Sequence, residues 1–140
     1  MYLRQQLFCI MLFLTSVLAV GCSRTISAPS TKAVSGSVTM KGKPAAQVLV
    51  TFHPQFELEH FKPSGTTNSE GKFTLSTGAA NNGAPAGKYL VTFEKMTAGS
   101  DKNGLDVDID LWKGKYADPK ASRFEVEIRE NGELAPFKLD

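Results

Sequence analysis

Three aspartates alternate with single apolar residues late in the chain, at Asp106, Asp108 and Asp110. Oxygen ligands two residues apart are the spacing at which a calcium-binding loop begins. Such a loop also needs glycine at its sixth position and a bidentate glutamate at its twelfth. The chain has Leu111 and Ala117 at those positions, so these aspartates are weak candidates for a metal site.

The same stretch has a second interpretation as a strand, because side chains alternate between the two faces of a sheet. The three carboxylates then share one face, and the apolar residues are expected to pack on the other. These apolar residues are Leu105, Val107, Ile109 and Leu111. A solvated edge strand protected by charge explains the pattern, and we prefer this interpretation to metal binding.

A second group of possible ligands contains both histidines of the chain. His53 and His60 flank a segment that includes Glu57 and Glu59, and nitrogen and oxygen ligands of these types bind zinc. The two histidines are seven positions apart with a proline between them, a spacing that does not fix a geometry, and no cysteine or third histidine adds to the set. Solvated loop histidines are therefore the preferred interpretation.

Nucleophilic catalysis has little support in the sequence. No serine lies in a Gly-x-Ser-x-Gly motif, and none is tied by spacing to a histidine and an aspartate. We expect no catalytic residues and no cofactor. A small hydrolase that depends on His53 or His60 is the least favoured alternative.

Cys22 stands where an apolar run gives way to a polar segment. Residues 7–20, LFCIMLFLTSVLAV, carry no charge and follow Arg4, which is the arrangement of a secretory signal. The run is also shorter than the roughly 20 residues that a membrane span needs. We therefore expect residues 1–21 to be a signal peptide that is removed.

The residues LAVGC at positions 18–22 resemble the lipobox of bacterial lipoproteins. The resemblance implies cleavage between Gly21 and Cys22, and acyl chains on the Cys22 sulfur and the freed amine. Two or more acyl chains hold a protein on a bilayer almost permanently. Ser23 favours the outer membrane or the cell surface, with the inner membrane possible. The other cysteine, Cys9, lies inside the signal, so no internal disulfide is expected.

Charge excludes one class of partner. The chain has 16 basic and 14 acidic side chains and a formal net charge of +2, which loss of Arg4 with the signal would lower by one. Such a balance gives no general attraction for nucleic acid, and no basic cluster is interleaved with aromatic residues. We expect no nucleic-acid partner.

The remaining sequence predicts a tether and one all-β domain. Residues 22–32 are rich in Ser and Thr and read as a flexible tether. Residues 33–140 contain short alternating runs separated by Gly, Pro, Asn and Asp, the pattern of a sandwich of about seven strands. The expected strands lie at 33–40, 47–53, 72–75, 88–95, 124–129 and 134–139. Asn131-Gly132 is expected to form a hairpin turn between the last two.

Three motifs resemble carboxypeptidase regulatory-like, or transthyretin-like, domains. They are Val34-Ser-Gly-Ser-Val38 with its following Gly-Lys-Pro, Thr67-Asn-Ser-Glu-Gly-Lys-Phe73, and Pro85-Ala-Gly-Lys-Tyr-Leu-Val91. The segment Lys115-Tyr-Ala-Asp-Pro119 resembles the tail of short bacterial lipoproteins with this domain. The resemblance implies a Greek-key sandwich of accessory or binding type without catalytic residues.

Four aromatic residues fall in segments expected to connect the strands: Phe56, Phe61, Trp112 and Tyr116. Exposed rings there could stack on sugars or anchor a protein partner. Alternatively, they fold back over the open ends of the sandwich, because a small domain needs its large side chains in the core. We expect a binding or scaffold module of the cell envelope with a protein or glycan partner. A self-contained glycan-binding module is the alternative.

Overall fold

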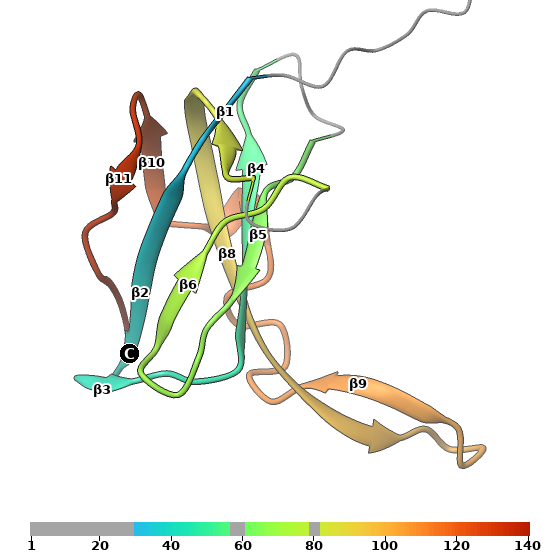
Figure 1. Cartoon of the computed structure of the whole chain (residues 1–140). Coiled ribbons are helices and arrows are strands. Elements are labelled where there is room, and N and C mark those ends of the chain that lie inside the picture. The colour runs from blue at the N-terminus through green and yellow to red at the C-terminus, as the bar shows by residue number, and fades with distance from the viewer. Residues whose placement is uncertain (1–29, 57–60, 79–81) are drawn as a thin grey trace, which may run out of the picture.

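A computed structural model describes residues 30–56, 61–78 and 82–140 of the chain. Gly21 and Cys22, with the rest of the expected signal and most of the expected tether, lie outside these residues. Within them the chain forms β-strands and one short 3₁₀ helix (Figure 1). The described residues include no helix that is both long and apolar enough to span a bilayer.

Eight strands have three or more residues, close to the seven or so expected. They are β2 (Val34–Met40), β4 (Val48–Pro54), β5 (Ser64–Thr66), β6 (Lys72–Thr74), β8 (Gly87–Ser100), β9 (Asp106–Asp110), β10 (Glu125–Ile128) and β12 (Phe137–Leu139). Four have only two residues: β1 (Thr31–Lys32), β3 (Lys43–Pro44), β7 (Ala84–Pro85) and β11 (Gly132–Glu133). The 3₁₀ helix η1 is Pro119–Ala121.

Two main sheets build the fold. In the first, the strand order is β10-β8-β4-β5, and β9 pairs with the far end of β8. In the second, β2 is the central strand and pairs with β3 and β6 antiparallel and with β11 and β12 parallel. The short strands β1 and β7 form a separate ladder. The prediction of an all-β sandwich is confirmed.

Alternating burial along three strands places the core between the sheets. In β4, and in β2 as far as Val38, every second residue is buried, and in β8 the buried residues begin at Tyr89. The completely buried apolar side chains, at 0% exposure, are Val38, Val48, Val50, Phe52, Leu75, Ala84, Tyr89, Val91 and Phe93. This is the face that the alternation in the sequence predicts.

The expected hairpin at Asn131-Gly132 is wrong. The strand before it, β10, pairs with β8 in the first sheet. The strands after it, β11 and β12, pair in parallel with β2 in the second sheet. The chain therefore crosses from the first sheet to the second at this point. Ile128 of the first sheet and Phe137 of the second are both buried in the core.

Strand β8 is longer than the sandwich that it enters. Its register with β4 ends at the pair Val48–Lys95, and no residue of β8 beyond Phe93 is buried. From Met96 to Ser100 the strand pairs with β9 instead. Residues 96–110 thus form a two-stranded hairpin, here called the arm, which projects from one end of the sandwich (Figure 1).

Candidate functional site

The arm carries the acidic stretch found in the sequence. Its tip is a tight turn, in which the Asp101 carboxylate accepts hydrogen bonds from the Asn103 and Leu105 amides at 2.8 and 2.9 Å. Gly104 follows with a φ of +79°, a conformation that glycine adopts without steric cost. The turn fixes the register in which β9 returns along β8.

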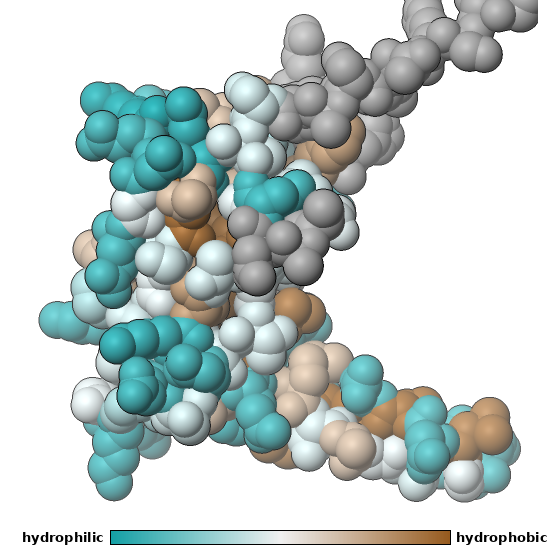
Figure 2. Space-filling view, in the orientation of Figure 1, coloured by the Kyte–Doolittle hydropathy of each residue, from teal (hydrophilic) through white to brown (hydrophobic). Residues whose placement is uncertain are grey.

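The apolar residues of this stretch are not packed as expected. Leu105 is 64% exposed, Val107 38%, Ile109 42% and Leu111 52%. The alternation was interpreted correctly as a strand, but within the described residues no second layer covers its apolar face. Figure 2 shows hydrophobic residues running along the projecting arm between polar ones.

Asp110 has a structural role that separates it from the other two aspartates. Its carboxylate accepts hydrogen bonds from the amides of Lys95 and Trp112 at 2.9 Å and from the Gly114 amide at 2.7 Å. Desolvation raises the pKa of this group, but the three backbone donors outweigh it and the pKa is lowered. Asp110 therefore clamps the base of the arm to the turn that follows.

The described residues contain no group of three or more His, Cys, Asp or Glu able to hold a metal ion. Asp106 and Asp108 are exposed on the arm. Because the oxygens of Asp110 already accept from three amides, this carboxylate is poorly placed to act as a ligand.

Replacing Asp110 with alanine should release the base of the arm. Three backbone N–H groups would lose their acceptor, and by analogy with helix caps we expect a cost of about 1 kcal/mol. Hydrogen exchange should become faster at Lys95, Trp112 and Gly114. The matched control is Asp108→Ala, which should leave these rates unchanged.

The pH dependence of this clamp follows from the direction of the shift. Because the folded pKa of Asp110 is depressed, its stabilisation is present at neutral pH and is lost as the pH falls through the folded pKa. Exchange at the three amides, corrected for its intrinsic pH dependence, should therefore rise in acid. Equal exchange rates at these amides in Asp110→Ala and in the wild-type chain at neutral pH would contradict the clamp.

The histidines are placed differently from the expectation. His53 lies in β4, half-buried, and its Nε2 is 2.9 Å from the Thr92 hydroxyl of β8. Burial, and then the nearby charge of Lys62, lowers its pKa. The prediction of a solvated loop histidine is wrong for His53, because its ring is partly buried within the sheet and contacts Thr92 of the neighbouring strand. His60, Glu57 and Glu59 lie outside the described residues.

Three of the four predicted aromatic residues pack against the core while remaining partly exposed: Phe56, Trp112 and Tyr116. Phe56 meets the buried Tyr89 edge to face at 5.3 Å, and Trp112 meets Tyr116 in the same way at 5.3 Å. Phe61 is also partly buried. The structure brings Trp112 and Tyr116 together, and it does not bring them to Phe56.

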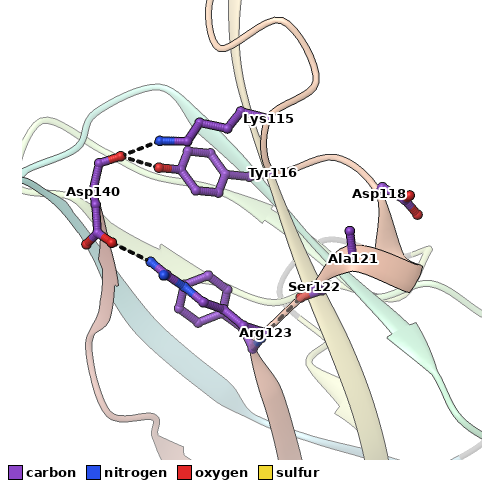
Figure 3. Close-up of a pocket in the computed structure, with 8 residues that line it drawn as sticks. Lys115, Tyr116, Asp118, Ala121, Ser122, Arg123 and Asp140 are labelled. Atoms are coloured by element: carbon purple, nitrogen blue, oxygen red, sulfur yellow. Dashed lines mark hydrogen bonds and ion pairs between the residues drawn. The ribbon is translucent and has the colours of Figure 1, made fainter.

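A pocket of about 200 Å³ lies beside Tyr116. Figure 3 shows three donors directed at Asp140. Lys115 Nζ donates to the main-chain oxygen of Asp140 at 2.8 Å, the Tyr116 hydroxyl donates to the same oxygen, and Arg123 pairs with the carboxylate at 2.9 Å. The hydrogen bond and charge of Arg123 lower the pKa of Asp140.

Asp140 already engages the three donors beside this pocket, so they are not free for a ligand. The Arg123–Asp140 ion pair is exposed on both sides, and such pairs contribute little stability. Only Tyr116 of this group was a candidate site residue from the sequence. Lys115 appeared only in the segment that resembles lipoprotein tails, and nothing in the sequence connected it with Arg123 and Asp140.

The fold and these surfaces define an all-β sandwich domain with a projecting arm. No protein-family profile matches the chain, and no curated protein matches it. Two solved structures are similar. A 9R-lipoxygenase from Cyanothece PCC8801 has 11% identity and a TM-score of 0.46, over 81% of this chain and 17% of the lipoxygenase.

The second similar structure is a DUF3823 family protein from Parabacteroides merdae ATCC 43184. It has 14% identity and a TM-score of 0.42, over 77% of this chain and 45% of that protein. The chain thus spans less than half the length of either structure. At these values the similarities carry no argument about activity.

Proposed function

We propose that the protein is a bacterial envelope lipoprotein whose β-sandwich is a non-catalytic binding or scaffold module. The sequence supports the anchor through the lipobox-like LAVGC at positions 18–22 and the polar tether that follows. The resemblance to carboxypeptidase regulatory-like domains supports an accessory role for the sandwich.

The observation that carries the binding role is the position of the arm relative to the tether. The last two residues of the expected tether, Thr31 and Lys32, form β1, which pairs with β7 just before β8 begins. The arm occupies the other end of β8, whose 14 residues span about 45 Å. Figure 1 shows β1 and the arm at opposite ends of the molecule. A domain tethered through β1 presents the arm away from the bilayer.

Labelling cells with a palmitate analogue tests the anchor. We expect the wild-type chain and a Cys9→Ala control to carry the label and Cys22→Ala to lose it completely, because the Cys22 sulfur accepts the first lipid. Mass spectrometry should find Cys22, acylated, at the mature amino terminus. Label retained in Cys22→Ala, or a mature terminus other than Cys22, would overturn the anchor.

The binding role is tested separately by affinity capture of the lipidated protein from its native membrane. We expect envelope proteins to be recovered with the wild-type chain and lost when the exposed apolar residues of the arm are changed together to serine. Retention on polysaccharide that depends on Trp112 would instead indicate the glycan-binding alternative.

A further inference from the structure

The outer edge of β9 is a free strand edge. Among the described residues β9 pairs with β8 and with no other strand. Its residues are exposed except for the partly buried Asp110. A strand edge of this kind is a template on which an extended segment of another chain adds by main-chain hydrogen bonds.

The hydrogen bonds of the arm show which residues offer that edge. At the tip the Asp101 amide donates to the Leu105 oxygen, and at the base the Leu111 amide donates to the Lys95 oxygen, both at 2.9 Å. Hydrogen-bonded and non-hydrogen-bonded pairs alternate in an antiparallel ladder. The main-chain groups of Val107 therefore point toward β8, and those of the residues on either side of it point outward.

The residues with outward main-chain groups are Asp106 and Asp108, so an added strand would meet the acidic positions directly. Residues opposite each other in a ladder share one face. A segment added in antiparallel orientation would place two alternate side chains against these two carboxylates, and the side chain between them beside Val107. The edge thus specifies charge at alternate positions and an apolar residue between them.

A second copy of this chain does not fit that pattern. The outward-bonding residues of two β9 strands are all aspartates, so each antiparallel register that joins them places Asp opposite Asp. Like charges directly opposite destabilise a strand pair. The acidic face therefore opposes self-association of an edge whose apolar face is exposed.

We propose that the free edge of β9 binds an extended segment of a partner protein with Lys or Arg at alternate positions and apolar residues between them. The basic side chains pair with Asp106 and Asp108 on one face of the extended sheet. On the other face, the apolar side chains cover Val107 and the neighbouring Ile109, whose side chain packs over Gly99 of β8. The inference rests on the proposed binding role but not on the lipid anchor.

Binding of synthetic peptides to the full chain in non-ionic detergent tests the proposal. The probe is a nonapeptide of alternating Lys and Val, and the control is its counterpart of alternating Glu and Val. We expect the basic peptide to bind about tenfold or more tightly than the acidic one at low salt. The difference should shrink as salt is added. General attraction does not produce this result, because the chain itself has a formal charge of +2.

The double variant Asp106→Lys, Asp108→Lys should reverse the preference, so that the acidic peptide binds more tightly. A second measurement uses the wild-type chain and needs no folded variant. Alternate amides of the basic peptide can be N-methylated in two ways, at the odd or at the even positions. Only one of these two patterns removes the main-chain donors that face β9, and that pattern should abolish binding. Equal binding of both peptides, a preference that is unchanged by the charge reversal, binding that survives both patterns of N-methylation, or dimerisation through β9 would overturn the proposal. These outcomes leave the result of acyl labelling at Cys22 unaffected.

Discussion

Replacing Phe137 with alanine is expected to lower the free energy of unfolding by about 3–5 kcal/mol. The ring is 6% exposed and lies at the centre of an aromatic cluster. It contacts the rings of Phe52, Phe73, Phe93 and Phe124 at centroid distances of 6.3, 6.2, 5.2 and 5.9 Å. Truncation removes these contacts and leaves a cavity between the sheets. Chemical denaturation followed by Trp112 fluorescence measures the loss.

The neighbouring Lys138 provides the matched control, because its side chain lies on the exposed face of β12. Lys138→Ala should change stability by no more than about 0.5 kcal/mol. Phe137→Leu should fall between the two, since it keeps much of the buried volume. If Phe137→Ala costs no more than Lys138→Ala, β12 does not close the core as described.

Gly71→Ala should be costly for a single added methyl group, with an expected loss of about 2–4 kcal/mol. Gly71 has a φ of +74°, and a Cβ there would lie 2.6 Å from the Val38 oxygen and 3.1 Å from the Ala45 amide nitrogen. The left-handed conformation costs a side chain about 1–2 kcal/mol, and overpacking adds about 1–3 kcal/mol. Main-chain atoms cannot move aside as a flexible side chain can.

Gly42→Ala separates the two contributions. Gly42 has a similar φ of +78°, but nothing lies within 4 Å of its Cβ position. This variant should show the conformational cost alone, so the difference between the two midpoints of denaturation measures the contact with β2. Equal losses in both variants would show that the close approach of Gly71 to Val38 is not maintained in solution.

The sequence alone was sufficient to predict the strands that are buried on one face. Val48, Val50 and Phe52 alternate with partly exposed residues in β4, and one-sided burial produces this period of two. The same signal does not state which strand is the neighbour. For that reason the alternation placed Phe137 correctly on the inward face of a strand, but the prediction that this strand forms a hairpin with β10 was wrong.

The arm shows a second limit of the alternation. Val107 and Ile109 alternate with aspartates as a half-buried strand would, yet both are more than a third exposed. The period identifies a face, but only the tertiary structure decides whether another layer covers it. A sequence signal for the hairpin was present in Asp101-Lys-Asn-Gly104, a turn with glycine at the αL position. The cluster at Asp140 gave no such signal, because its members come from separate segments.

The continuity of β8 has a mechanical consequence. One strand pairs with β4 at seven positions and with β10 at four, and then continues into the arm without interruption. A pull on the arm is therefore transmitted along the strand axis, and it loads both ladders in shear so that their hydrogen bonds resist together. A load applied to a loop would instead unzip such bonds one after another. The first sheet can thus resist a pull on the arm over the full length of these two ladders.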